Sequence, residues 1–365
     1  MAEPWPARKE ENGRPRAQAE ARARLLEHAG KARAGRRLRP GRIAVWGAGV
    51  VAVCAAAALV LVPAVRDDDG GGPVAKARRT ADGVLLAAAD AADRQPPENG
   101  RYLHTSSRET ELVSAGTERS SFLVVEDRVT DHWQAARPAR DGSLVWTRRL
   151  GTRPLSAEDE QAWKAAGSPA RVAGLSWTGR PKVELRQAGA WKRSRVEVGK
   201  SASRAKVGTL GSAKVTLGRL NALPADAGEL RASLLGRYRG GEAGTDLWLF
   251  GAARDLLDGS LPVRPEVRAA AYRMMAGLGG VALLGPAQDG RGRPGTAIAF
   301  DEPGNERGLV RHTLIVDEGT GRLLEAREMM LNPSRAYAKI PEGTVYDSVV
   351  YDHEWTDARP AVPRS

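Results

Sequence analysis

A glycine-rich stretch near the C-terminus matches a nucleotide-binding pattern in its spacing. Gly290, Gly292 and Gly295 stand as in G-x-G-x-x-G. That pattern binds a pyrophosphate when a strand precedes it and a helix follows it, because the N-terminus of the helix faces the phosphates. Here Pro294 lies inside the motif, and the segment TAIAF that follows, 296–300, has the composition of a strand. The motif therefore predicts a turn between two strands, and we expect no cofactor.

The histidines are the next candidates for chemistry, as metal ligands or as a general base. They are His28, His104, His132, His312 and His353. None of them is spaced as H-x-x-x-H or lies near the single cysteine, Cys54, so the sequence specifies no metal site. His312 and His353 each lie near an acidic residue and could meet in the folded chain, but only their geometry would make one of them a base. We therefore predict satisfied histidines and a protein that is not an enzyme.

The tryptophans are candidates for ligand binding rather than for catalysis. The candidates for a common cavity are Trp133, Trp146 and Trp355 on predicted strands and Trp248 on a predicted helix. A tryptophan packs into a core wherever it falls, because its large apolar surface favours burial. Pockets for small molecules are also lined by aromatic side chains, and a curved sheet can enclose one. Core and domain-interface packing is therefore the favoured interpretation, and an apolar ligand cavity lined by the four tryptophans is the functional alternative.

Strands and helices that would position these residues are segregated along the chain. Alternating apolar and polar residues predict strands at 102–106, 121–133, 143–149, 281–284, 296–300, 311–316, 322–330 and 344–355. Three consecutive helices are predicted between the two runs of strands, opened by Asp226, Thr245 and Pro265. Two more are predicted at 81–95 and from Ser156. Segregated runs of strands and helices indicate an α+β domain, here 80–358, with a curved antiparallel sheet and packed helices.

An uncharged apolar segment, 43–65, precedes this domain. As a helix it would rise roughly 35 Å, which is enough to cross a hydrocarbon core of about 30 Å. A cleaved signal peptide has an apolar core of only about 7 to 15 residues. A lipid-modified cysteine is not expected either, because the apolar run continues well beyond Cys54. The segment therefore predicts a single transmembrane helix.

Charged residues on the two flanks predict its orientation. Arg36, Arg37, Arg39 and Arg42 precede the segment, and the acidic run 67–69 follows it, so the N-terminus is expected in the cytoplasm. On this reading 1–42 is a cytoplasmic tail, 66–79 a flexible linker, and 359–365 a short tail after the extracytoplasmic domain. Residues 1–42 carry 12 Lys or Arg against 5 Asp or Glu, so they hold most of the net charge of +12. Attraction to the anionic inner leaflet accounts for that charge, and we expect no nucleic-acid partner.

The cytoplasmic tail contains one segment with helical composition, 16–29. A zinc-binding regulatory domain would need histidine and cysteine ligands at short spacing, and this tail has only His28. Any cytoplasmic partner must then be bound by a metal-free helix. Leu25 and Leu26 are its one strong apolar pair, so we expect them to make the partner contact.

Several phrases of the sequence resemble an uncharacterised actinobacterial family of single-pass membrane proteins. They are LPADAGELRASLLGRY, DGRGRPGTAIAF, LIVDEGTGRLLEAREM, GTVYDSVVYD and the basic segment ARARLLEHAG before the apolar span. The resemblance covers most of the chain and fits least well over 150–220. It implies the topology above and association with extracytoplasmic-function sigma factors, and it brings no catalytic residues. The D-x-x-T-G hairpin is also similar to the lipoprotein-carrier and sigma-regulator sensor fold, a curved antiparallel sheet that cradles helices.

Three functions remain open on the sequence alone. The leading hypothesis is a membrane-anchored, extracytoplasmic binding or sensing protein linked to sigma-factor control. A second is a carrier or holder of a lipid or another cell-envelope ligand in the sheet cavity. A third is a hydrolase whose site assembles from residues distant in sequence. Such a site would have no local nucleophile motif, because Ser176 in GLSWTG does not match the G-x-S-x-G elbow.

Overall fold

The computed structural model describes residues 79–96, 99–117, 120–136, 142–174, 182–185, 187–196, 206–211, 213–240 and 244–363. The chain divides into two units, Met1–Pro73 and Val74–Ser365, and every described residue belongs to the second. The predicted cytoplasmic tail, the apolar span 43–65, Cys54, and the pair Leu25 and Leu26 all lie outside the described residues. Within the described ranges, no helix is both long enough and apolar enough to span a membrane.

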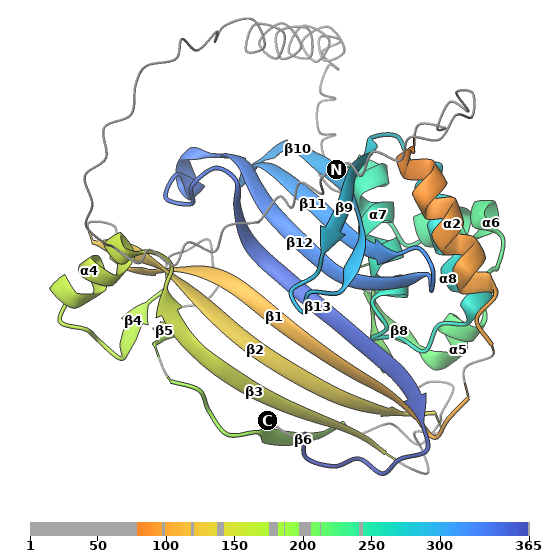
Figure 1. Ribbon diagram of the computed structural model, residues 1–365, viewed down its shortest axis with the longest axis horizontal. Helices are drawn as coiled ribbons and strands as arrows, with labels where there is room; N and C mark the ends of the chain where they lie inside the picture. Colours follow the sequence, from red (N-terminus) through yellow and green to blue (C-terminus); the bar gives the residue numbers. More distant parts are fainter. Residues whose placement is uncertain are drawn as a thin grey trace, which may run out of the picture. The chain divides into compact units, whose positions relative to one another are not determined.

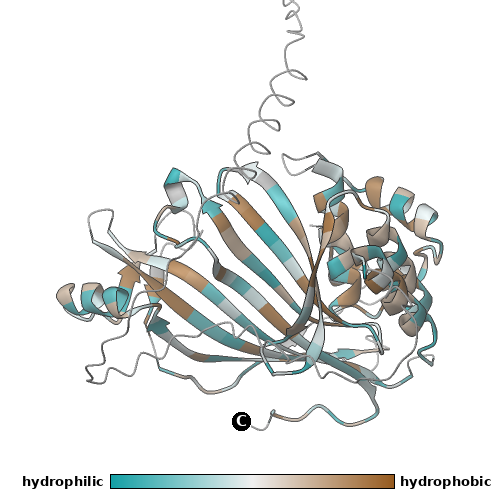
Figure 2. Cartoon of the chain, turned by 45° about the horizontal axis from the view of Figure 1, so that its top comes forward, coloured by the Kyte–Doolittle hydropathy of each residue, from teal (hydrophilic) through white to brown (hydrophobic). Residues whose placement is uncertain are grey.

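One large antiparallel sheet forms the centre of the described unit (Figure 1). Its strands are β1 (Tyr102–Gly116), β2 (Ser121–Ala135), β3 (Ser143–Pro154), β6 (Lys192–Val196), β9 (Val281–Gln288), β10 (Pro294–Asn305), β11 (Gly308–Asp317), β12 (Arg322–Pro333) and β13 (Thr344–Thr356). Their spatial order is β6-β3-β2-β1-β13-β12-β11-β10-β9. Two small sheets pair β4 (Arg171–Ala173) with β5 (Lys182–Glu184) and β7 (Lys206–Leu210) with β8 (Ala213–Thr216). The sheet curves along its width, as Figure 2 shows.

The first and last strands of the sequence join the two halves of the sheet. β1 pairs with β13 from Tyr102 opposite Thr356 to Glu111 opposite Asp347. On one side β1, β2 and β3 form a meander, and on the other side β9 to β13 form a second one. The helices are inserted between these meanders in sequence, so the sheet is completed only when the C-terminal strand returns to the N-terminal one.

Helices cover one face of the sheet over its C-terminal half (Figure 1). They are α2 (Ala81–Asp93), α5 (Leu217–Asn221), α6 (Ala227–Leu235), α7 (Gly244–Leu257) and α8 (Pro265–Ala276), while α4 (Ala157–Ala165) contacts β2 and β3 and the 3-10 helix η3 (Arg335–Tyr337) precedes β13. Side-chain caps define the N-termini of several helices. Ser156 forms a reciprocal capping box with Asp159, and Asp226 accepts hydrogen bonds from the N–H groups of Gly228 and Glu229 at 2.8 and 2.9 Å.

The main core lies between these helices and the sheet. α8 is the central helix, because it contacts α2, α6 and α7. The fully buried side chains include Leu249 and Leu256 of α7, Val267, Tyr272 and Met275 of α8, and Ile298, Leu314 and Val316 of β10 and β11. Full burial of one such aliphatic side chain contributes about 1.5 to 3 kcal/mol. We call the sheet face that carries these residues the helix-bearing face.

One glycine allows the β11–β12 turn to contact α2. Gly321 has φ +66°, and a Cβ built on it would lie 2.6 Å from the carbonyl oxygen of Ala88. A larger residue would therefore be strained by its backbone and would also collide with the helix. Thr80 caps α2 by accepting a hydrogen bond from the N–H of Gly83 at 3.1 Å.

The predicted α+β class and most predicted elements are confirmed. The G-x-G-x-x-G stretch is a turn between β9 and β10, in which one oxygen of Asp289 accepts from the N–H groups of Arg291 and Arg293 at 2.9 and 2.8 Å. The three consecutive helices are α6, α7 and α8. The strands are longer than predicted: β2 runs to Ala135 and β3 to Pro154. Cross-strand pairing extends a strand through charged residues that interrupt its sequence pattern.

Candidate ligand-binding site

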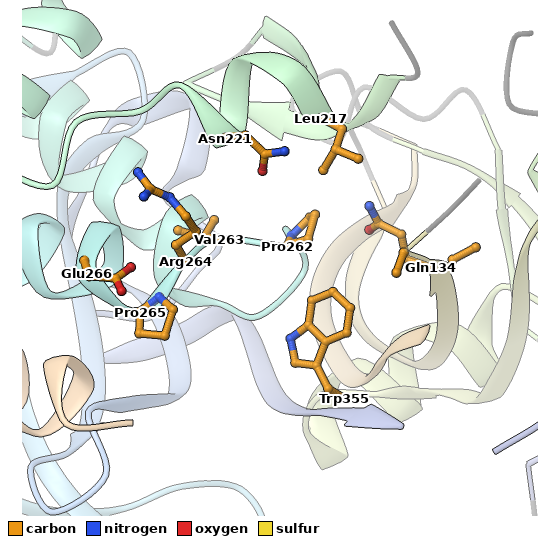
Figure 3. A pocket seen from close by; sticks show the side chains of 11 residues that line it. Gln134, Leu217, Asn221, Pro262, Val263, Arg264, Pro265, Glu266 and Trp355 are labelled. Atoms are coloured by element: carbon orange, nitrogen blue, oxygen red, sulfur yellow. The ribbon is translucent and has the colours of Figure 1, made fainter. Parts of the chain in front are cut away.

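A pocket of about 330 Å³ opens beside the N-terminus of α8 (Figure 3). Its walls come from β2, β13, α5 and the segment that leads into α8. The residues that line it are Gln134, Ala135, Ala136, Leu217, Asn221, Pro262, Val263, Arg264, Pro265, Glu266 and Trp355. We call it the Trp355 pocket. Its volume falls at the lower end of the range that holds small-molecule ligands.

The sheet supplies the floor of the Trp355 pocket. Trp355 of β13 lies opposite Leu103 of β1, and Leu103 lies opposite Gln134 of β2. Directly opposed residues on antiparallel strands point to the same face, so these three side chains form one row on the helix-bearing face. Leu103 is buried and Trp355 is half-buried. In Figure 3 the indole ring of Trp355 borders the open space, with Gln134 beside it.

Gln134 is the unusual member of this row. Its side chain is only 5% exposed, yet its Oε1 has no hydrogen-bond partner among the described residues. A buried polar atom without a partner costs about 1 to 3 kcal/mol, so almost all such atoms in folded proteins are paired. Gln134 lines a pocket that is open to solvent, while its Oε1 is shielded, so a ligand supplies the missing hydrogen bond only when the carboxamide turns toward the pocket.

The opposite wall is polar at its rim. The guanidinium of Arg264 donates a hydrogen bond to the carbonyl oxygen of Leu223 at 2.9 Å, which holds its side chain beside the end of α5. Pro265 begins α8, and Glu266 lies in the first turn of that helix, where an acidic residue is favoured. Asn221 is exposed at the C-terminal end of α5. The pocket thus combines an aromatic floor with two carboxamides and two opposite charges.

The structure divides the four tryptophans of the predicted cavity among three places. Only Trp355 lines the Trp355 pocket. Trp133 and Trp146 are buried in a cluster with Tyr102, on the opposite face of the sheet. The indole N–H of Trp133 is satisfied there, because it donates to Asp131 at 2.7 Å. Trp248 of α7 lies against Tyr238, with ring centroids 5.5 Å apart, and lines a separate hollow. The single four-tryptophan cavity is therefore corrected to a pocket with one tryptophan.

A second polar site lies on the helix-bearing face at the other half of the sheet. Nε2 of His312 lies 3.0 Å from Glu302 Oε2, and its Nδ1 lies 3.4 Å from Glu328 Oε1. Arg307 contacts the same two carboxylates, at 2.9 Å to Glu302 and 3.2 Å to Glu328. Tyr346 donates to Glu328 at 2.6 Å. We call these five residues the His312 cluster.

The pKa shifts in the His312 cluster follow from this pairing. Burial lowers the pKa of His312, but the hydrogen bonds to Glu302 and Glu328 outweigh burial, so the net shift is upward. Burial raises the pKa of Glu328, yet His312, Tyr346 and Arg307 together hold it at about 2. A protonated His312 therefore completes a cluster in which two cations face two carboxylates.

Asp347 lies next to this cluster. It is opposite Glu328 on one side and Glu111 on the other, and it lines a pocket of about 230 Å³ between α7 and the sheet. No ion pair or hydrogen bond to its carboxylate is found within the described ranges. Burial, with Glu328, Glu109 and Glu111 nearby, raises the pKa of Asp347 to about 7.

The two C-terminal histidines do not meet. His312 belongs to the row of Glu328 and Asp347, whereas His353 is opposite Thr105, far along β13. His353 is 7% exposed and packs against Gly259, where a Cβ would lie 2.2 Å from its Nδ1. Among the described residues, no group of three or more His, Cys, Asp or Glu side chains is arranged to hold a metal ion.

Sequence reasoning identified Trp355 but missed Gln134 and the His312 cluster. A signal for the cluster was present, since the short turn at 317–321 sets the register of β11 and β12 and places His312 opposite Glu328. Gln134 carries no comparable signal. Comparisons of the chain with models of known families, with curated proteins and with solved structures found no match.

Proposed function

We propose that this protein is a non-enzymatic, membrane-anchored binding protein that holds a small ligand in the Trp355 pocket outside the cytoplasm. The observation that carries the binding role is Gln134, a buried residue with an unpaired Oε1 that belongs to the lining of an open pocket beside Trp355. Such a carboxamide is stabilised when a bound molecule completes its hydrogen bonds. The anchor and its orientation are supported by the uncharged span 43–65, with basic residues before it and acidic residues after it.

Binding fits the pocket better than catalysis does. In the part of the chain that the structure describes, its lining contains Arg264 and Glu266 but no serine, cysteine, histidine or lysine, so no nucleophile lies beside a general base among these residues. In the His312 cluster, the histidine is held between two carboxylates that also pair with Arg307. That arrangement stabilises the protonated imidazole, whereas a general base must be available in its neutral form.

A lipid carrier would need a long apolar lining, and the described residues on the open part of the helix-bearing face do not form one. Side chains on that face of β1, β2 and β3 include Ser107, Glu109, Arg128, Thr147 and Arg149. Arg128 pairs with Glu109 at 3.2 Å, and Arg149 lies 3.4 Å from Glu126. In Figure 2 hydrophilic colours interrupt the hydrophobic ones along these strands. A hydrocarbon chain on this surface would desolvate charged groups without replacing their hydrogen bonds.

The proposed route for reporting ligand binding is the cytoplasmic tail. Leu25 and Leu26 would contact a partner, and the resemblance to sigma-factor-associated membrane proteins makes an extracytoplasmic-function sigma factor the partner to test. Two buried leucines supply about 3 to 6 kcal/mol, so the contact is weak unless the partner is held at the membrane. Crosslinking and recovery of partners from cells should therefore succeed with the intact protein and fail with L25D/L26D. Equal recovery from both would remove the regulatory part of the proposal.

The binding role itself is tested by fragment screening against the full-length chain. Ligand-observed NMR with a small-molecule fragment library should give hits that are lost in Trp355→Leu. Trp163→Leu is the matched control, because Trp163 lies on α4, where its indole N–H donates to the carbonyl of Pro169 at 3.2 Å. Hits that survive in Trp355→Leu, or no hits at all, would contradict a ligand site in this pocket.

A further inference from the structure

The chemistry of the Trp355 pocket narrows the class of its ligand. Gln134 and Asn221 are carboxamides, each with donor and acceptor atoms, while Arg264 only donates and Glu266 in its ionised form only accepts. A ligand that fits all four must both donate and accept at several points of its edge. Hydroxyl groups do this, because each has one donor and two acceptor sites.

The floor of the pocket sets a second requirement. Trp355 is half-buried, and its indole ring borders the open space between α5 and the segment that leads into α8 (Figure 3). Leu217, Pro262 and Val263 add further apolar surface. A ligand must therefore present an apolar face to the floor while its edge is polar. A sugar ring has this shape, because its C–H groups form a face and its hydroxyls surround it.

Charge gives a third requirement. Among the described residues, the pocket lining contains one cation, Arg264, and one carboxylate, Glu266, so their formal charges cancel. Part of the Arg264 guanidinium is already used, since it donates to the carbonyl of Leu223 at 2.9 Å. An anionic or cationic ligand would gain attraction from one of these groups and repulsion from the other. A neutral ligand is favoured.

We propose that the Trp355 pocket binds a neutral saccharide, which stacks on Trp355 and hydrogen-bonds through a hydroxyl group to Gln134. This inference rests on the proposed binding function. A saccharide meets all three requirements, whereas a hydrocarbon chain would leave Gln134 unpaired and a phosphorylated sugar would face Glu266. The same chemistry is present in free sugars and in the glycans of a cell envelope.

The test uses the full-length chain in a detergent that has no sugar headgroup, because a glycoside detergent would compete for the site. Saturation-transfer NMR with methyl glycosides of glucose, mannose, galactose and N-acetylglucosamine, and with their linear tetrasaccharides, should give binding to at least one neutral sugar. Gln134→Leu should weaken it tenfold or more, and Trp355→Leu should abolish it. Gln288→Leu, an exposed glutamine at the end of β9, should leave it unchanged.

A second experiment uses purified cell-envelope glycan and distinguishes a free sugar from an envelope polymer as the ligand. Retention of the full-length chain on glycan, released by a matching tetrasaccharide, would assign an envelope polymer, whereas binding of methyl glycosides alone would assign a free sugar. Sugar binding that Gln134→Leu leaves intact would overturn this inference. If no sugar binds but library fragments bind in a Trp355-dependent way, the saccharide class is wrong and the proposed binding function stands. If neither binds, both fail.

Discussion

The Trp355 pocket and the His312 cluster bury polar groups on the same face of the sheet but satisfy them differently. In the His312 cluster, both ring nitrogens of the histidine and both carboxylates have partners within the chain. In the Trp355 pocket, the buried Oε1 of Gln134 has none among the described residues. A self-contained network stabilises the fold, whereas an unpaired buried atom of a residue that lines a pocket leaves a hydrogen bond for a ligand to make. The comparison therefore sets a polar network that we expect to be structural against a polar residue that we expect to bind a ligand.

The largest expected effect comes from breaking the His312 cluster. His312→Ala should lower the free energy of unfolding by about 3 kcal/mol, because it removes one partner of two mostly buried carboxylates. Urea unfolding of the purified variant measures this. Arg311→Ala, which breaks the exposed pair with Asp301, should cost at most about 1 kcal/mol. A loss from His312→Ala no larger than that of the control would show that the cluster is not structural.

The pH dependence of that loss follows from the pKa shifts. The pKa of His312 is raised in the folded state, so its contribution is full below about 6.5 and is lost as the pH rises through the folded value. The pKa of Glu328 is lowered to about 2, so its contribution is full above about 4.5 and is lost as the pH falls toward 2. The difference in stability between wild type and His312→Ala should therefore be largest between about pH 4.5 and 6.5. A difference that does not change from pH 3 to pH 9 would contradict these shifts.

Replacing Asp347 should raise the stability, whereas replacing His312 should lower it, because burial and three neighbouring carboxylates outweigh the attraction between Arg254 and the charge of Asp347. Its pKa rises from 3.8 to about 7 on folding. The contribution of protonated Asp347 to the free energy of unfolding is therefore complete below pH 3.8 and is lost as the pH rises through 7. Asp347→Asn should therefore raise the free energy of unfolding by about 2 kcal/mol at pH 8 and leave it nearly unchanged at pH 3.5. Denaturant titrations at the two pH values check this, and an equal change at both would be the contrary result.

Local features of this fold could be predicted from the sequence, and long-range ones could not. The turn at 317–321, the cap at Ser156 and the helix start at Pro265 are set by neighbouring residues, and all three are present. The pairing of β1 with β13 joins segments that are far apart in the chain, and no local pattern specifies it.

The same division applies to the candidate site. Trp355 could be selected by residue type, because a tryptophan on a strand is either core or binding surface. Gln134 could not, because it was found through the absence of a partner for one buried atom, which it shares with four other described side chains. That property depends on Leu103 and Trp355 beside it and on α5 opposite, which only the folded chain brings together.

The most direct test of the central claim measures stability and binding on one variant, Gln134→Leu. Leucine is similar in size to glutamine and needs no hydrogen bond, so the free energy of unfolding without ligand should stay the same or rise by about 1 kcal/mol. Binding of library fragments to the full-length chain should fall at least tenfold in the same preparation. A Gln134→Leu protein that is destabilised by about 2 kcal/mol, or that binds as well as wild type, would show that Gln134 serves the fold and not a ligand.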